Sequence, residues 1–471
     1  MQRRRAKLFI FKEDSRFFAG FMKVSGRFDA ILTEFSGGTY MTYEKKSFAE
    51  MNTEELLAVC SAEQARLDRW SDMNLTLDLT RGKPNQAQLD LSTGMLSIVS
   101  ERGDCFSESG LDCRNYGVLD GLPETKRLFS DLLGIPASRI LVLGNSSLNV
   151  MYDTLVRAML FGVAGGHEPW CRQGRIKFIC PSPGYDRHFT ICRTLGIEMV
   201  PVKLNEDGPD MDAVYDLACS DPSVKGIWCV PKFANPEGIT YSDEVVEAMA
   251  AMRPAAPDFR IFWDNAYAVH ELYDEEVHLA NIFDYARENG TEDNIFYFAS
   301  TSKITFPGSG LAIMAASERN LEQIRPIIAT QTIGYDKINQ MRHVKFFKNA
   351  DGIRAHMRQE AEIIRPKFEL VESLFHKHLD GLGIAHWTEP RGGYFISLYV
   401  KEGCARRVYQ LARSVGVTLT TAGSTYPYGR DPQDSNLRIA PTYPEPEELE
   451  QAITILCSCI KLACAEKYLK A

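Results

Sequence analysis

Hydrophobic residues recur at helical spacing in several parts of the chain. Residues 53–70 show this repeat, so we expect an amphipathic helix that Thr53 caps and whose first turn carries acidic residues. Residues 351–379 predict a long charged helix, and residues 445–456 predict the start of a last helix. A different pattern occupies the central part of the chain.

Short β-branched apolar runs alternate with helical segments between residues 115 and 316. The candidates for buried strands are residues 139–145, 176–185, 197–204, 224–233, 259–265 and 295–300. Alternating strands and helices are typical of a largely parallel sheet that helices cover. The pattern therefore predicts an α/β fold for this part of the chain.

The character of the chain changes again after about residue 345. The strand candidates that follow the long charged helix are residues 384–400, 417–423 and 436–442. Together with the last helix they predict a second domain of the α+β class. We expect a large domain over residues 96–345, and a small domain formed by residues 46–95 and 346–471.

The first 45 residues differ from the rest of the chain. They begin with a basic stretch, but the acidic residues Glu13 and Asp14 follow it, and no cleavage-site pattern of a targeting peptide is evident. We expect residues 1–45 to form a disordered extension, and Met41 is a candidate for the natural initiator.

The composition is that of an ordinary globular protein, with 45% hydrophobic and 24% charged residues. Acidic residues (62) outnumber Lys and Arg (53), and the net charge of -9 argues against nucleic acid as a partner. No apolar run reaches the roughly 20 residues that a membrane-spanning helix needs, so we expect no membrane association. The 12 cysteines contain no Cys-x-x-Cys pair, which indicates reduced thiols of a cytoplasmic protein without a metal centre.

We expect the catalytic and binding residues just after the strands, because ligands of open α/β sheets lie at the carboxyl ends of strands. Ser146 and Ser147 follow one strand candidate and open a helix, where free N–H groups and hydroxyls can hold a phosphate. Each serine alone is more typical of an ordinary helix cap. Tyr185 follows another strand and could cover a planar ring, although a half-buried loop tyrosine is equally consistent with the pattern.

Polar residues also follow or end the last three of these strand candidates. Asn235 lies in a turn that can present an amide, Asp264 ends an apolar strand with Tyr267 after it, and Lys303 follows the last strand. A carboxylate in that position is costly to bury without a cation, although helix capping is an alternative. A phosphate cradle, a ring cover, a carboxylate for a ring nitrogen and a lysine together predict a pyridoxal phosphate site.

With these residues in this order, the chain resembles the fold-type I pyridoxal phosphate enzymes, and within them the aspartate aminotransferases. The resemblance runs from about Glu54 to the last helix. It implies a mostly parallel sheet of the seven-stranded type with helices on both faces, a smaller α+β domain, and a homodimer with shared active sites.

Several segments carry the resemblance. "RNYGVLDGLPETKR" is similar to the family segment whose tyrosine reaches the cofactor phosphate of the opposite subunit, which implies that role for Tyr116. "ANPEG" implies that Asn235 contacts the ring O3′ and the substrate. "DNAYA" implies Asp264 at the pyridine nitrogen and Tyr267 at O3′.

Two further segments complete the expected site. "STSK" implies that Lys303 is the Schiff-base lysine and that Ser300 and Ser302 bind the phosphate. "NLRIAP" implies that Arg438 holds the substrate carboxylate, for which a planar bidentate guanidinium is well suited. We also expect Gly82, in "TRGKPN", among the substrate-binding residues.

The chain departs from the family pattern in the loop after Lys303. The family carries an arginine a few residues after the Pro-Gly pair, whereas residues 307–311 here contain none. This form of the loop resembles a divergent bacterial subgroup that is grouped with aminotransferase-like transcription regulators. The residues before Thr53 show no helix-turn-helix pattern, so a regulator is the less favoured reading.

The expected reaction is ping-pong transamination of an amino acid with a 2-oxo acid, with L-aspartate and 2-oxoglutarate as the favoured pair. Lys303 would carry the proton between the substrate Cα and the cofactor. A dicarboxylate needs a second cation, and the candidates are Arg81, Lys83, Lys337 and Arg342. An alanine or broad-specificity aminotransferase, a pyridoxal phosphate-dependent lyase and a non-catalytic cofactor-binding protein remain as alternatives.

Overall fold

The computed structural model describes residues 31–35, 38–42 and 46–470, and it contains two compact units, residues 1–46 and 47–471. In the first unit, β1 (Ile31–Phe35) pairs with β2 (Gly38–Thr42) in antiparallel orientation. The prediction of a disordered extension falls largely outside the described residues and stays a prediction.

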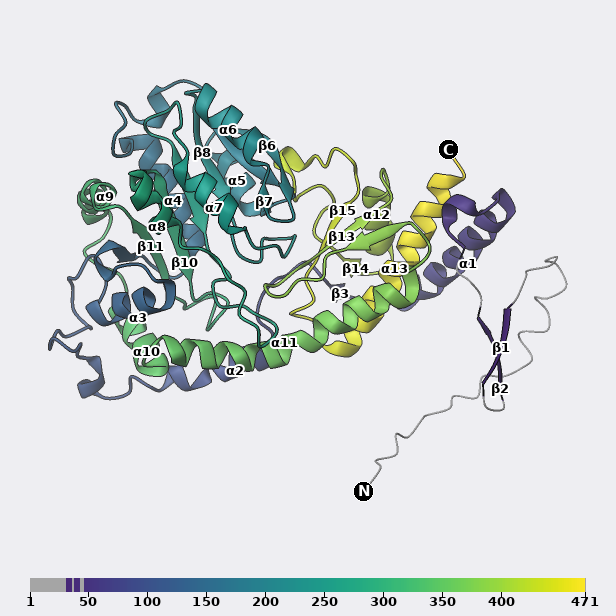
Figure 1. Ribbon diagram of the computed structural model, residues 1–471. Helices are drawn as coiled ribbons and strands as arrows, with labels where there is room; N and C mark the ends of the chain where they lie inside the picture. The colour runs from purple at the N-terminus through teal and green to yellow at the C-terminus, as the bar shows by residue number, and fades with distance from the viewer. Residues whose placement is uncertain (1–30, 36–37, 43–45, 471) are drawn as a thin grey trace. The chain divides into compact units, whose positions relative to one another are not determined.

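An eight-stranded sheet forms the centre of the second unit (Figure 1). Its strands lie in the order β4 (Ile140–Val142), β11 (Ala312–Ala316), β10 (Ile295–Ser300), β9 (Arg260–Asp264), β8 (Val224–Cys229), β5 (Lys177–Ser182), β6 (Glu198–Asn205) and β7 (Gly208–Pro209). Six of these strands run in one direction, and β11 and β7 run opposite to them. The predicted mostly parallel sheet is confirmed, and the two-residue β7 adds an eighth strand to the seven expected.

Helices cover both faces of this sheet because successive strand residues point to opposite sides. In β8, Ile227 and Cys229 join one hydrophobic cluster, whereas Trp228 joins another. The first cluster includes residues of α3 (Pro123–Leu133), α6 (Met211–Ser220), α7 (Asp243–Ala251) and α8 (Ile282–Asn289). The second includes residues of α4 (Ser147–Phe161), α5 (Asp186–Thr194) and α9 (Glu318–Gln331).

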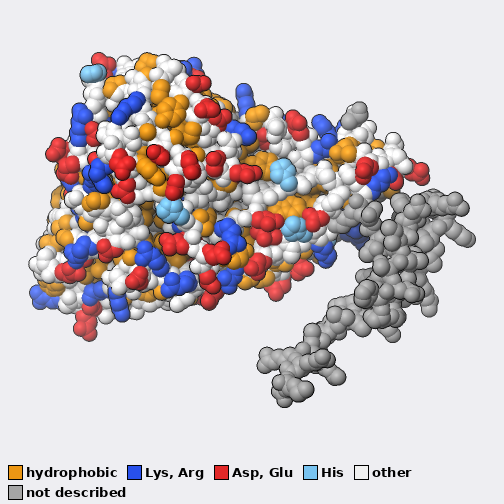
Figure 2. All heavy atoms as spheres, in the orientation of Figure 1, with side chains coloured by type: hydrophobic (Ala, Val, Ile, Leu, Met, Phe, Trp, Pro, Cys, Tyr) orange, Lys and Arg blue, Asp and Glu red, His pale blue; other side chains and the backbone are white. Residues whose placement is uncertain are grey.

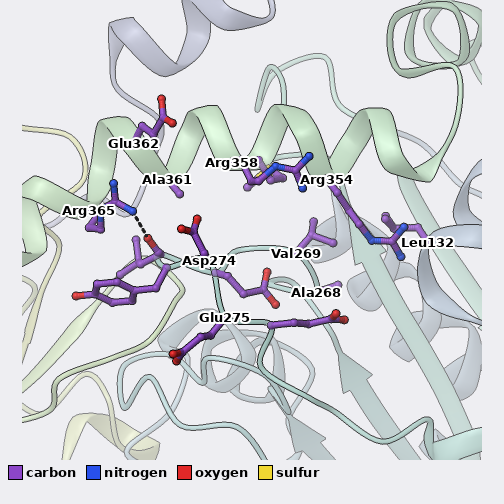
Figure 3. A pocket seen from close by; sticks show the side chains of 15 residues that line it. Leu132, Ala268, Val269, Asp274, Glu275, Arg354, Arg358, Ala361, Glu362 and Arg365 are labelled. Carbon is purple, nitrogen blue, oxygen red and sulfur yellow. Dashed lines mark hydrogen bonds between the residues drawn. The ribbon is translucent and has the colours of Figure 1, made fainter.

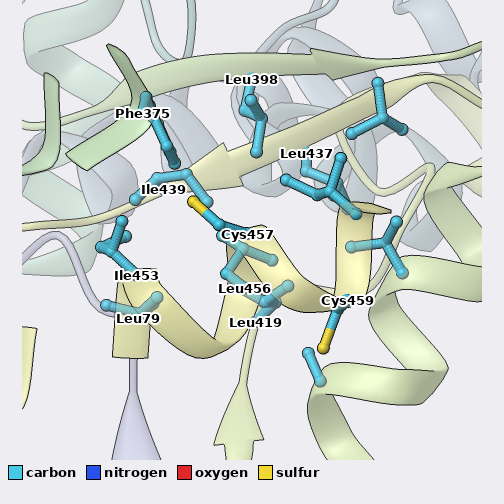
Figure 4. Packing of buried hydrophobic residues seen from close by; sticks show 14 of the residues in the cluster. Leu79, Phe375, Leu398, Leu419, Leu437, Ile439, Ile453, Leu456, Cys457 and Cys459 are labelled. Atoms are coloured by element: carbon cyan, nitrogen blue, oxygen red, sulfur yellow. The ribbon is translucent and has the colours of Figure 1, made fainter. Parts of the chain in front are cut away.

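A third hydrophobic cluster brings together the two ends of the second unit (Figure 4). Its strands are β12 (Ala385–Trp387), β13 (Ile396–Val400) and β15 (Asn436–Ile439) in one antiparallel sheet, and β3 (Leu77–Asp78) paired with β14 (Val417–Thr418). Its helices are α1 (Thr53–Ser71), α11 (Ala350–Leu379), α12 (Ala405–Ser414) and α13 (Pro446–Tyr468). Two further helices, α2 (Gln86–Leu91) and α10 (Lys337–Phe347), pack against α11. The domain boundaries stay a prediction, and we keep the names large domain (96–345) and small domain (46–95 and 346–471).

The cap of α1 differs from the prediction. Asn52, and not Thr53, is the capping residue, and its Oδ1 accepts a hydrogen bond from the Glu55 N–H at 2.9 Å. The Glu55 carboxylate in turn accepts from the Asn52 N–H at 2.7 Å. This reciprocal pair satisfies two N–H groups of the first turn, which a threonine one residue later could not do.

Acidic and basic side chains alternate over the visible face of the molecule (Figure 2). No continuous basic surface is seen on that face, in keeping with the net charge of -9. Among the described helices, none is long and apolar enough to cross a bilayer.

Candidate active site

Four adjacent parallel strands bring the predicted residues to one edge of the sheet. β10, β9, β8 and β5 are neighbours in that order and run in the same direction, so their carboxyl ends meet. Lys303, Asp264, Asn235 and Tyr185 lie at or just after these four ends. The sheet topology therefore explains why residues spread over 118 positions of the chain can share one site, since 303 − 185 = 118.

Lys303 is held among aromatic rings. Its Nζ lies 4.6 Å from the ring centroid of Tyr267 and 5.8 Å from that of Tyr394. Burial lowers the pKa of the Lys303 amine, although Tyr185 and Asp264 act in the opposite direction. A lowered pKa favours the neutral amine, which is the form that attacks a carbonyl or accepts a proton.

Two buried side chains also hold the backbone of Lys303. Its carbonyl oxygen accepts hydrogen bonds from His270 Nε2 at 3.2 Å and from Tyr394 Oη at 3.3 Å. Burial lowers the pKa of His270 to about 3, so the ring stays neutral at ordinary pH. Neither His270 nor Tyr394 was predicted from the sequence, in which the glycine pair before Tyr394 is the local signal.

Asp264 has one occupied and one unoccupied carboxylate oxygen. Its Oδ2 accepts a hydrogen bond from His188 Nε2 at 3.1 Å, and its buried Oδ1 has no partner among the described residues. His188 stacks on Trp228 with ring centroids 4.2 Å apart, which orients the histidine. No helix begins at Asp264, so the capping alternative is not supported. A buried oxygen without a donor is suited to a protonated ring nitrogen of a ligand.

Two tyrosines border the same space. Burial raises the pKa of Tyr185 to about 12 and also raises the pKa of Tyr267, where Asp264 adds to the effect. Both phenols therefore stay protonated and can donate hydrogen bonds at neutral pH. The Tyr185 ring lies edge-on to His188, with centroids 4.9 Å apart.

The predicted phosphate cradle lies at the start of α4. Ser146 occupies the capping position without a capping hydrogen bond from its side chain, and Ser147 is the first helical residue. Ser300 Oγ donates to Ser302 Oγ at 3.1 Å, and Ser302 Oγ donates to the carbonyl of Asn145 at 3.2 Å. The serines after β10 are thus connected to the loop before α4, next to N–H groups at a helix N-terminus.

Arg438 projects from β15 toward this edge and is largely buried, with 8% of its surface exposed. Its guanidinium donates to Asp186 Oδ1 at 2.9 Å and to Asn235 Oδ1 at 3.3 Å. It also lies 4.7 Å from the ring centroid of Phe395. Gly82 packs against that same ring, since a Cβ on Gly82 would come within 2.2 Å of it. Phe395 thus connects two of the predicted substrate-binding residues.

The remaining predicted residues have different surroundings. Tyr116 is 78% exposed, so its side chain is not part of this cluster within the chain. Of the four candidate cations, Arg81 pairs with Asp78, Lys83 lies over the Tyr443 ring and Lys337 donates to the Gly117 carbonyl. Arg342 has a buried Nε without a partner among the described residues. It lines a cavity of about 290 Å³ together with Asn145 and residues 308–310 of the loop that lacks the family arginine.

A separate cavity of about 350 Å³ lies between α11 and the loop after Tyr267 (Figure 3). Arginines of α11, such as Arg354 and Arg358, and acidic residues of that loop, such as Asp274 and Glu275, line this cavity. None of the predicted site residues lines this cavity. The candidate active site is therefore the strand-end cluster.

The strand-end residues fit pyridoxal phosphate. The unpartnered Asp264 Oδ1, the helix N-terminus with its serines and the buried Lys303 amine are the groups that a pyridine nitrogen, a phosphate and an aldehyde require. The missing family arginine does not remove the cradle, because hydroxyl and N–H donors remain there.

Comparisons with known proteins show the family to which the chain belongs. The sequence profile of the family described as aspartate amino-transferase matches residues 51–471. The aspartate aminotransferase of Corynebacterium glutamicum is 42% identical over 429 residues, which are 91% of this chain and 99% of that protein. A Mycolicibacterium smegmatis protein assigned only to the aminotransferases is 45% identical over 424 residues, 90% of this chain and 99% of its own. The crystal structure of an aspartate transaminase from C. glutamicum superposes with a TM-score of 0.87 at 43% identity, covering 90% of this chain and 99% of that one.

Proposed function

Because this chain belongs to the aspartate amino-transferase family, we propose that it transfers the amino group of L-aspartate to 2-oxoglutarate with pyridoxal phosphate as cofactor. The observation that carries the proposal is the buried Lys303 amine together with Asp264 Oδ1, which has no partner among the described residues, at the ends of adjacent parallel strands. The cofactor, when bound, supplies an electron sink for the substrate carbanion.

Each residue of the candidate active site has a separate role in the proposed reaction. Lys303 acts first as a general base, which removes the proton from the substrate Cα. It then acts as a general acid, which donates this proton to the cofactor. Asp264 keeps the ring nitrogen protonated, and His188 orients Asp264 through the bond to Oδ2. Arg438 binds the α-carboxylate of the substrate. Tyr267 and Asn235 form hydrogen bonds with the O3′ atom of the cofactor ring.

We further propose a homodimer in which Tyr116 reaches the phosphate of the second subunit. Support comes from the 78% exposure of Tyr116, which leaves its side chain accessible to a second subunit, and from the family resemblance of its segment. The twelve unpaired cysteines support a cytoplasmic location.

A donor panel tests the proposed substrate. Purified enzyme with pyridoxal phosphate and 2-oxoglutarate should give the highest kcat/KM with L-aspartate, ahead of L-alanine and L-phenylalanine. Either of the latter outperforming aspartate would contradict the proposed donor and leave an aminotransferase of other specificity.

A lyase on the same cofactor would use the same Lys303 and Asp264. The two classes can be distinguished when the 2-oxo acid is left out, because a transaminase then stops after one half-reaction per site. Continued release of product without any 2-oxo acid would contradict transamination.

A further inference from the structure

Arg438 is oriented by an acidic residue of the other domain. Its Nη1 donates to Asp186 Oδ1 at 2.9 Å and to Asn235 Oδ1 at 3.3 Å, which occupies both N–H groups of that nitrogen. Arg438 comes from β15 of the small domain, whereas Asp186 is the first residue of α5 in the large domain.

The opposite edge of the guanidinium keeps N–H groups available. The Nη2 nitrogen donates to Thr420 Oγ1 at 3.1 Å, which leaves its second N–H. The Nε of Arg438 is buried and has no partner among the described residues. Nε and Nη2 lie on the same edge of a guanidinium, and this edge can bind both oxygens of a carboxylate.

Asp186 lies at the start of α5, next to two other residues of the site. Tyr185, directly before it, borders the ring space, and His188, two residues after it, orients Asp264. The Asp186 side chain is 26% exposed against 8% for the Arg438 side chain, so the carboxylate neutralises a cation that is more deeply buried than itself.

We propose that Asp186 is a positioning residue for substrate recognition: it holds the Nη1 edge of Arg438 so that the Nε and Nη2 edge faces the α-carboxylate of amino-acid and oxo-acid substrates. This inference rests on the proposed function, in which Arg438 binds that carboxylate. Asn235 and Phe395 contact the guanidinium as well, but Asp186 is the charged partner. Without it, the guanidinium loses a charge-assisted bond and can rotate about its long side chain.

Three variants separate positioning from other roles. Asp186→Ala removes charge and acceptor, Asp186→Asn keeps an acceptor oxygen and removes the charge, and Asp212→Ala removes an exposed acid from the first turn of α6 as a matched control. We expect Asp186→Ala to raise the KM of L-aspartate and of 2-oxoglutarate about 10-fold, with kcat within about threefold of wild type. Asp186→Asn should raise KM less than Asp186→Ala does, and Asp212→Ala should change neither constant.

A binding measurement keeps this inference distinct from the proposed function. Calorimetric titration of the holoenzyme with maleate, a dicarboxylate that does not react, should show a dissociation constant about 10-fold higher for Asp186→Ala, independent of turnover. If wild type binds maleate but does not transaminate, the proposed function fails and the inference stands. An unchanged or lower dissociation constant in Asp186→Ala would overturn the inference, since a lower one would show that Asp186 competes with substrate. Should Asp186→Ala not fold, Asp186→Ser, with a side chain too short to reach Arg438, serves in its place under the same criteria.

Discussion

The two sides of the candidate active site are built differently. On the large-domain side, Lys303 and Asp264 follow directly from the ends of buried parallel strands, so the backbone of the sheet determines where they lie. On the small-domain side, Arg438 is oriented by side chains of other segments, including Asp186, Asn235 and Thr420.

This difference separates chemistry from recognition. A change on the strand-end side removes a group that acts on the reacting atoms, so it should lower kcat. A change around Arg438 alters how a carboxylate is held before and during the reaction, so it should act largely through KM. The following predictions test that separation, in order of decreasing effect.

Lys303→Ala should give the largest loss, with kcat reduced by roughly 10⁴-fold or more, because Lys303 supplies the amine that moves the proton, whereas Lys232, which follows β8, is held in an ion pair with Glu271. Steady-state assays with aspartate and 2-oxoglutarate measure the loss, and circular dichroism should show an unchanged fold. Lys203→Ala, at an exposed position of β6, is the matched control and should retain full activity. Residual activity of more than a few per cent would mean that Lys303 is not the proton carrier.

Asp264→Ala should lower kcat by about 10³-fold, because the carboxylate keeps the ring nitrogen protonated, and a protonated ring is the better acceptor for the electron pair left when the Cα proton is removed. His188→Ala should have a smaller effect of the same kind, since His188 only holds the second oxygen of Asp264. Single-turnover absorbance with aspartate measures the step directly. A proton-abstraction rate equal to that of wild type would reduce Asp264 to a structural residue.

Arg438→Lys should lower kcat/KM by about 100-fold, or roughly 2–3 kcal/mol, mainly through KM. A lysine keeps the positive charge but cannot form the planar two-point contact. Initial-rate measurements with both substrates give the two constants. If kcat falls and KM does not change, recognition and chemistry are not divided between the two sides as stated above.

Tyr394→Phe should have the smallest effect, a loss of about 1 kcal/mol, or roughly fivefold in kcat. The Lys303 carbonyl would keep the hydrogen bond from His270 and lose the one from Tyr394. A comparison of kcat and KM with wild type checks this expectation. An effect on KM alone would indicate that Tyr394 contributes to substrate binding and not to the chemical step.

The two sides also differ in how far the sequence predicted them. Asp264 and Lys303 were predicted because an apolar run that ends in a polar residue is visible in one segment of the chain. Asp186 and His188 were missed, because no local pattern shows that the first turn of α5 returns to β9 and β15. Asn52 was missed for a different reason: two adjacent residues can both cap a helix, and only the backbone angles and the contact with Glu55 distinguish them.

The attachment point of the cofactor tests the central claim most directly. Wild-type protein reconstituted with pyridoxal phosphate, reduced with borohydride and digested should carry the pyridoxyl label on the peptide that contains Lys303. Lys203→Ala should carry the same label, and Lys303→Ala should carry none. A label on any other lysine of the wild-type protein would contradict the assignment of the strand-end cluster as the active site.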